Sequence, residues 1–347
     1  MKHRKSNFEL LRIVAMLMII DVHYFAACNA GECTTAYGGN WIIYHILESA
    51  GICGVNLFVL ITGFFSYEKE TIKVRKIVNL ICEVAFWGGT GFLLSVLAAW
   101  KDADLKELIK AVFPIFFGGR WFVKIYIILL CMIPFLNILI NLLTKESFRI
   151  LLVISLVLFS VWPSFLPYPP VNDHGYGIVQ FILLYIIAVY MRLHCEKYPP
   201  KAVCLLGYLV SASVVCAASI LGMNDAWAYS HIFVIVEAVC LFMFFAQLEI
   251  RSIWVNKIAS NAFGVFLIHT ESFFSIVVYD KLLRCNELVC GNALLFLASA
   301  VISLPVFYLL GFVLESVKKK VFDLTVNPLL DKSILLNKSI TINKNEC

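Results

Sequence analysis

The chain of 347 residues contains few charged side chains. Asp, Glu, Lys and Arg make up only 15% of it, hydrophobic residues make up 61%, and the mean hydropathy is +0.88. A soluble globular domain has about 25% charged residues, so this composition excludes a soluble protein of this length. The sequence also lacks low-complexity linkers and internal repeats. We therefore expect an integral membrane protein.

Spacings typical of metal sites are lacking as well. None of the 12 cysteines is placed as in a zinc or iron–sulfur site, so we expect no bound metal. Most cysteines lie within apolar runs, where a thiol behaves as a small apolar group. Two pairs, Cys28/Cys33 and Cys285/Cys290, fall in predicted external loops, where they either form disulfides or remain free thiols.

Long apolar runs recur along nearly the whole chain. A helix needs about 20 apolar residues to cross a bilayer. The sequence predicts ten such spans, at residues 8–28, 41–66, 77–100, 121–143, 150–167, 177–192, 202–222, 229–248, 258–279 and 292–316. The expected fold is an all-α bundle of about ten transmembrane helices in residues 1–316, followed by a short cytoplasmic tail at 317–347.

The distribution of basic residues predicts the orientation. With the N-terminus in the cytoplasm, 21 of the 28 Lys and Arg residues fall in cytoplasmic segments and seven in external ones. Because cytoplasmic loops are enriched in Lys and Arg, we expect both termini to be cytoplasmic. The net charge of +5 reflects this bias, and we expect no nucleic-acid partner.

The first predicted span, "NFELLRIVAMLMIIDVHYFAAC", contains four ionisable residues, Glu9, Arg12, Asp21 and His23. Each costs a few kcal/mol at membrane depth, and such residues usually face a bundle interior or a water-filled path. Arg12 and His23 are eleven residues apart, so they lie on nearly the same helix face, about 16 Å apart along the axis. We expect both to point into a polar cavity.

Four segments resemble the membrane acyltransferase-3 family, and they occur in the family's order. The first span carries its hallmark, a basic residue followed after ten positions by His, as Arg12 and His23. "GVNLFVLITGFF" is similar to its second-span signature, with Asn56 in the variable polar position. "RWFVKIYIILLCMIPFLN" resembles its Trp-Phe/Tyr segment and contributes Trp121. "SNAFGVFLIHTES" resembles its late "FGIYLIH" element and contributes His269.

The resemblance implies a multi-pass enzyme of the bacterial cytoplasmic membrane, in contact with membrane lipids. Such an O-acyltransferase moves an acyl group, usually acetyl from cytosolic acetyl-CoA, to a hydroxyl of a cell-envelope polysaccharide or lipid-linked saccharide. Acyl-CoA is a substrate, and no bound cofactor is implied. Many relatives have paired arginines after the second span; here "KVRK" offers Lys73, Arg75 and Lys76 for the donor phosphates, or these residues reflect only the positive-inside bias.

Three residues are candidates for catalysis. The unperturbed pKa of histidine suits His23 to act as a general base or to carry the acyl group, although a histidine in a membrane helix also serves as a structural hydrogen-bonding group. Arg12 offers a forked donor for phosphate, or it extends toward lipid headgroups. His269 has either a supporting or substrate-binding role or a structural one.

For the acceptor, the candidates are Asn56, Trp121, His45 and Glu48. The last two are spaced i, i+3, so they share a helix face near the predicted external side.

The sequence leaves one other function open. A secondary transporter or flippase of an envelope glycolipid also has about ten spans with charged residues inside. The sequence shows no repeated half, which favours the acyltransferase.

Overall fold

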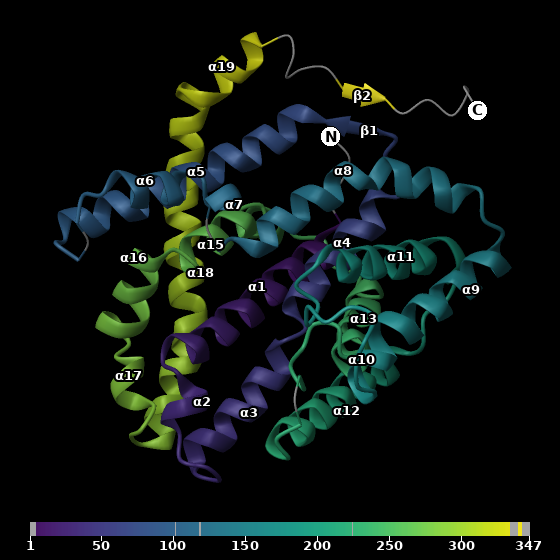
Figure 1. Ribbon diagram of the computed structural model, residues 1–347, viewed down its shortest axis with the longest axis horizontal. Helices are drawn as coiled ribbons and strands as arrows, with labels where there is room; N and C mark the ends of the chain where they lie inside the picture. Colours follow the sequence, from purple (N-terminus) through teal and green to yellow (C-terminus); the bar gives the residue numbers. More distant parts are fainter. Residues whose placement is uncertain (1–4, 101, 118, 224, 334–338, 342–347) are drawn as a thin grey trace.

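The computed structural model describes residues 5–100, 102–117, 119–223, 225–333 and 339–341, which are almost entirely helical (Figure 1). The first ten helices are α1 (Ser6–Ala27), α2 (Ala30–Cys33), α3 (Gly39–Gly51), α4 (Gly54–Ser66), α5 (Val74–Leu97), α6 (Leu105–Val112), α7 (Pro114–Phe117), α8 (Trp121–Asn141), α9 (Lys145–Leu156) and α10 (Trp162–Phe165). The others are α11 (Ile178–His194), α12 (Lys201–Ile220), α13 (Ile232–Ala246), α14 (Ile253–Ala259), α15 (Ala262–His269), α16 (Ser272–Ser275), α17 (Cys285–Leu288), α18 (Ala293–Leu324) and α19 (Val326–Lys332). Two π-helical segments, η1 (Val157–Val161) and η2 (Ile276–Leu282), and two strands, β1 (Thr71–Lys73) and β2 (Ser339–Thr341), complete the described elements.

The helical membrane fold is confirmed, whereas the count of ten spans is not. Within the described residues, seven helical segments are long and apolar enough to cross a membrane, or eight with one bent pair. Two other predicted spans are the shorter helices α11 and α13, of 17 and 15 residues. At 1.5 Å per residue, α13 is only about 22 Å long, less than the roughly 30 Å of a hydrocarbon core. The orientation of the chain stays a prediction.

The bent pair interrupts the predicted span at 258–279. Ile253–His269 and Ser272–Leu282 meet at an angle of 88°. Backbone polar groups at membrane depth need partners, so a broken helix is tolerated only where protein or a cavity surrounds it. The break directly follows His269, which places this side chain at a helix end inside the bundle.

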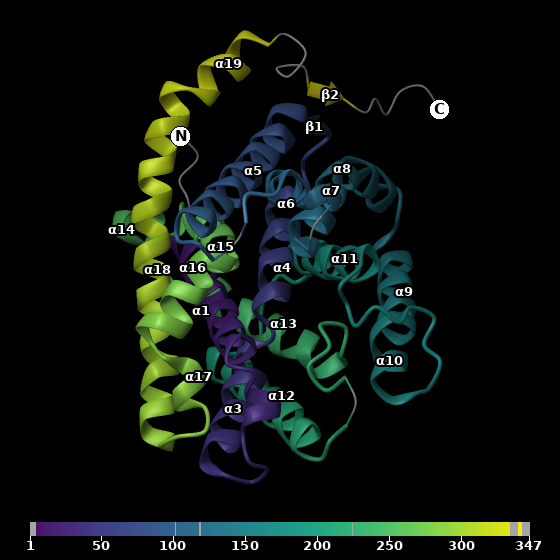
Figure 2. The ribbon, with the colours of Figure 1, turned by 60° about the vertical axis from the view of Figure 1, so that its left-hand side comes forward.

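Helix α1 lies at the centre of the molecule, and α18 runs along one side of it (Figure 2). α1 packs against α3, α4, α14 and α18, and its Leu11, Ala15 and Met16 are completely buried. Helix α4 begins directly against α1, because a Cβ atom at Gly54 would lie only 2.9 Å from the carbonyl oxygen of Ala15. Small residues at such crossings let two membrane helices approach closely.

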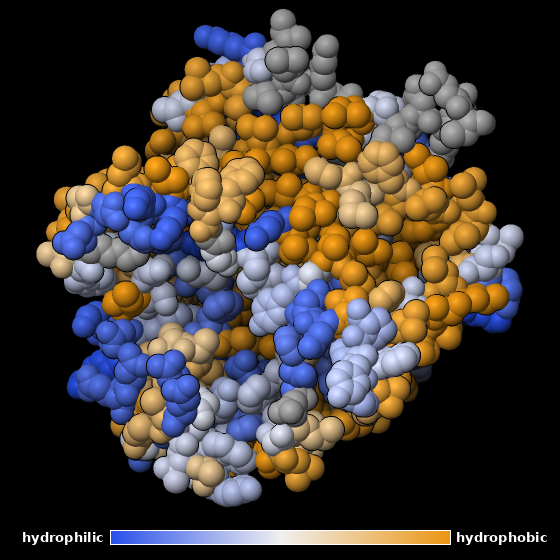
Figure 3. Space-filling view, viewed as in Figure 1, coloured by the Kyte–Doolittle hydropathy of each residue, from blue (hydrophilic) through white to orange (hydrophobic). Residues whose placement is uncertain are grey.

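The surface separates into apolar and polar regions (Figure 3). The apolar area covers α8 and α9, where large side chains such as Leu139, Leu142, Ile150 and Val153 are exposed. Polar residues gather over α6 and α17. Contiguous exposed apolar surface of this kind is typical of a protein that contacts lipid.

The C-terminal segment folds back onto the loop after α4. The predicted domain boundary at residue 316 falls within α18, and residues 334–338 and 342–347 of the predicted tail lie outside the described part of the chain. β2 pairs antiparallel with β1, with Ile340 opposite Ile72, and Asp331 forms an ion pair with Arg75.

The two cysteine pairs considered from the sequence are not the contacts found. Cys28, Cys33, Cys285 and Cys290 are free thiols. The Cys28 thiol instead donates to the carbonyl oxygen of Phe25 at 3.5 Å, and the Cys290 thiol donates to the carbonyl oxygen of Cys33 at 3.0 Å. The second contact joins the end of α2 to the segment after α17 rather than residues within one loop.

Candidate active site

Two histidines that are 246 residues apart in the chain meet inside the bundle. The rings of His23 and His269 are perpendicular, with their centroids 4.8 Å apart. Nε2 of His269 lies 3.4 Å from Nδ1 of His23. In the sequence the two histidines belong to separate motifs, and the fold makes them neighbours.

The backbone determines which nitrogen of each ring carries hydrogen. Nδ1 of His23 lies 2.8 Å from the carbonyl oxygen of Ile19, and Nδ1 of His269 lies 3.1 Å from that of Val265. A carbonyl oxygen only accepts hydrogen bonds, so both Nδ1 atoms are donors and both Nε2 atoms hold lone pairs in the neutral rings. His269 Nε2 faces the N–H of His23, and Nε2 of His23 is left to act as a base.

Both histidines line a cavity of about 950 Å³, here called the His23 cavity. Arg120, directly before α8, also lines this cavity, and its hydrogen bonds hold the break in the bent helix in place. Its guanidinium donates to the carbonyl oxygen of Leu267 at 3.1 Å and to the side chains of Thr270 and Glu271. The Arg120 and Glu271 side chains are only 13% and 12% exposed. Sequence analysis did not predict this ion pair, although both residues lie within the quoted motif segments.

Of the two predicted acceptor residues of α3, only Glu48 lines the His23 cavity. Glu48 is 8% exposed, and its Oε2 has no hydrogen-bond partner among the described residues. His45 is not among the described residues that line this cavity. Its ring lies between those of Trp41 and Trp227, with centroids 4.1 and 5.1 Å away, and its Nδ1 is 2.8 Å from Ser219 Oγ.

Aromatic rings form another part of the same wall. Trp121 lines the His23 cavity, with its ring centroid 4.5 Å from that of Tyr176 and 5.6 Å from that of Tyr229. Asn56 is fully buried behind this group, and its amide donates to the carbonyl oxygen of Tyr229 at 3.0 Å. Asn56 therefore supports the wall through the backbone of Tyr229.

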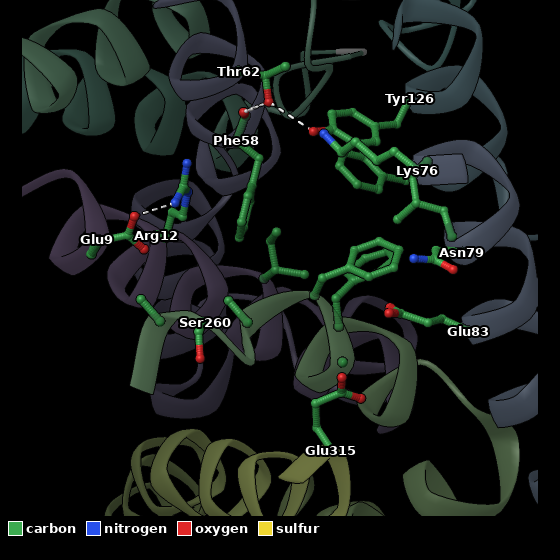
Figure 4. Close-up of a pocket in the computed structure, with 18 of the residues that line it drawn as sticks. Glu9, Arg12, Phe58, Thr62, Lys76, Asn79, Glu83, Tyr126, Ser260 and Glu315 are labelled. Carbon is green, nitrogen blue, oxygen red and sulfur yellow. Dashed lines mark hydrogen bonds and ion pairs between the residues drawn. The ribbon is translucent and has the colours of Figure 1, made fainter. Parts of the chain in front are cut away.

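A second cavity of about 440 Å³, here called the Arg12 cavity, contains the predicted donor residues Arg12 and Lys76 (Figure 4). The two side chains lie on opposite sides of it. Arg12 is paired with Glu9 at 2.6 Å and is 31% exposed. Lys319 from α18 adds a further cation to the lining. The carboxylates of Glu9, Glu83 and Glu315 line the same cavity, so its charges are mixed. The three cations can still offer charge-assisted hydrogen bonds to phosphate.

The other predicted donor residues lie outside this cavity. Arg75 is engaged by Asp331, and Lys73 belongs to β1. Lys69, a further basic residue of the same predicted cytoplasmic cluster, donates to Ser66 Oγ at 2.8 Å. Desolvation by the surrounding protein, together with the charges of Lys76, Lys73 and Arg12, lowers the pKa of Lys69 to about 8. A bound anion would stabilise this cluster of like charges.

The sequence led us to expect that Arg12 and His23 point into one cavity. In the structure they line different cavities. They line two cavities with a common wall, because Ile19, Phe122 and Phe266 line both. The helix-face argument was correct for α1, whose side chains at 12, 19 and 23 all border cavities. The shared residues come from three helices, Ile19 from α1, Phe122 from α8 and Phe266 from α15.

A family model described as an acyltransferase domain matches residues 5–312, nearly the whole chain. Neither the curated proteins nor the solved structures gave a match to this chain. The matched range contains both cavities except for the lining residues of α18 at 315 and 319.

Proposed function

Since the chain belongs to the acyltransferase-3 family, we propose that it transfers an acyl group, most simply acetyl, from cytosolic acyl-CoA to a hydroxyl of an envelope polysaccharide or lipid-linked saccharide. The observation that carries this proposal is the lone-pair nitrogen of His23, which an apolar wall separates from the cavity that contains Arg12, Lys76 and Lys319. Family membership favours this function over the transporter that the sequence left open.

The Arg12 cavity is suited to the donor. Coenzyme A carries several phosphate charges on a long flexible arm that ends in the thioester. Arg12, Lys76 and Lys319 offer charge-assisted hydrogen bonds for the phosphates, and Lys69 adds charge nearby. The uncharged arm would then extend along Phe58 and Phe263 toward the wall.

The His23 cavity is suited to a saccharide acceptor. Aromatic rings such as Trp121, Tyr176 and Trp227 give flat apolar faces for the C–H groups of a sugar ring. The unpartnered oxygen of Glu48 can accept a hydrogen bond from a sugar hydroxyl. These groups would hold the reactive hydroxyl near His23.

In the proposed reaction, Nε2 of His23 removes the proton from the acceptor hydroxyl as its oxygen attacks the thioester carbonyl carbon. The tetrahedral intermediate then expels the thiolate of coenzyme A, which takes the proton back from His23. His269 Nε2, facing the N–H of His23, would stabilise the transient positive charge on the imidazole. Arg120 supplies positive charge in the same cavity for the developing oxyanion. Transfer through an acyl-imidazole of His23 uses the same nitrogen.

The deciding experiment compares envelope saccharides from cells with wild-type protein, a His23→Ala variant and no protein. We expect the mass increment of one acetyl group per modified hydroxyl with the wild type alone. Equal acylation in all three samples would contradict the proposal.

Adjacent residues after β1 offer a matched test of donor binding. We expect Lys76→Gln to raise the apparent KM for acetyl-CoA roughly tenfold, since a hydrogen bond to a charged group contributes about 1.5–3 kcal/mol. Arg75→Gln removes the same charge from the exposed pair with Asp331 and should change KM less than twofold. Initial rates against acetyl-CoA concentration measure both, and equal KM shifts would show that only general surface charge matters.

A further inference from the structure

The wall between the two cavities is apolar and tightly packed. Ile19 comes from α1, Phe122 from α8 and Phe266 from α15, so three separate helices close it. Ile19 and Phe122 are 4% and 7% exposed, and the ring centroids of Phe122 and Phe266 are 5.1 Å apart. None of the three side chains offers a hydrogen bond to a substrate.

The same helical turns hold the histidines. The carbonyl oxygen of Ile19 accepts the hydrogen bond from His23 Nδ1, and Phe266 lies one turn before His269, with ring centroids 5.6 Å apart. A group that passes from the Arg12 cavity to Nε2 of His23 must therefore cross between these side chains. In the proposed reaction, the wall therefore lies on the route of the acyl group.

Resting on the proposed acyl transfer, we infer that Ile19, Phe122 and Phe266 select the acyl group by its length. An acetyl thioester needs space at the wall for one methyl group beyond the carbonyl carbon, whereas a longer acyl group must place each additional methylene among packed side chains. Close-packed interiors resist such insertion. In an apolar pocket, one methylene changes specificity by roughly 10- to 200-fold. The wall thus gives the protein a preference for acetyl over longer donors.

A simpler role for the wall would be to seal one cavity from the other. A seal alone would keep water and ions from passing, and opening it would increase hydrolysis of acetyl-CoA without changing which acyl group is preferred. A length filter changes the preference itself. The ratio of longer-acyl to acetyl products therefore distinguishes a filter from a seal, whereas the total amount of product does not.

The test uses membranes that contain the full-length protein, together with an envelope-saccharide extract of the cells as acceptor. Acetyl-CoA, butanoyl-CoA and hexanoyl-CoA are supplied at equal concentrations, and mass spectrometry gives the ratio of longer to acetyl products. Phe266→Ala opens the wall. Phe244→Ala is the matched control, because Phe244 of α13 is partly buried and is not among the described residues that line either cavity. Ile19→Ala is a second wall variant in case Phe266→Ala does not fold.

We expect the wild type to prefer acetyl over butanoyl by at least about tenfold, and a wall variant to reduce this preference by at least about tenfold. Phe244→Ala should leave the ratio within about twofold of wild type. An unchanged ratio in an active wall variant, with or without more hydrolysis, overturns the filter, and so does equal use of all three donors by the wild type. Failure of the wild type to acylate the extract with any donor contradicts the acyltransferase itself and is thereby distinguished from failure of the filter.

Discussion

His23→Ala is expected to lower the rate of acyl transfer by about 10²–10⁴-fold while leaving the amount of protein in the membrane unchanged. A sugar hydroxyl is a weak nucleophile unless a base removes its proton during attack, and general-base catalysis contributes about this factor. The hydrogen bond to Ile19 leaves the lone pair on Nε2 of His23, in the cavity proposed for the acceptor. The measurement is kcat for saccharide acetylation at matched expression.

Two other histidines provide the comparison. His174 is an exposed loop residue paired with Asp225, so His174→Ala should retain near-normal activity. His269→Gln should retain more activity than His269→Ala, because an amide oxygen can still accept the hydrogen bond from His23 Nδ1. If His269→Ala were inactive and His23→Ala nearly normal, His269 rather than His23 would be the base.

The sequence predicted the helical membrane fold well because apolar runs reveal membrane helices without knowledge of their packing. Its count of ten spans is not confirmed, because α11 and α13 are shorter than the other candidate spans. Most residues of α11 are buried inside the bundle. A helix enclosed by other helices is as apolar as one that crosses lipid, and it need not match the membrane thickness. Composition alone cannot separate the two cases.

Helix periodicity located Arg12 and His23 on one face of α1, but it could not reveal the wall between them. That wall depends on Phe122 and Phe266, which reach α1 from elements more than 90 residues away in the chain. Local pattern was equally unable to separate Lys76 from Arg75. Adjacent helical residues point about 100° apart, and only the tertiary structure shows which one faces the cavity.

The sequence also could not reveal the partners of polar residues inside the bundle. The sequence grouped Asn56 with the substrate-binding residues, and the fold places it behind Tyr229, where it satisfies a backbone carbonyl. Arg120 was counted only as an external positive charge, because nothing in its sequence neighbourhood indicates a partner 151 positions later. Tertiary ion pairs of this kind need the structure, and this one lies directly beside the proposed base.

Arg120→Met is expected to destabilise the protein by about 3–5 kcal/mol and to abolish most acyl transfer. The substitution leaves the Glu271 carboxylate largely buried without its guanidinium partner, and removing one member of a buried ion pair carries a cost of that size. It also removes the hydrogen bond to the Leu267 carbonyl at the 88° break, so His269 should lose its fixed position against His23. Thermal unfolding in detergent and the acetylation rate measure the two effects.

The controls separate the ion pair from the general loss of a cation. Lys124→Met removes an exposed positive charge from the same helix. It should change both the unfolding equilibrium constant and the acetylation rate by less than about twofold. Arg120→Met combined with Glu271→Gln removes both charges, so it should recover part of the lost stability. Activity should remain low in the double variant, because the positive charge proposed to stabilise the oxyanion is still missing. Full activity of Arg120→Met would show that the break holds His269 without this residue and that the oxyanion is stabilised by another group.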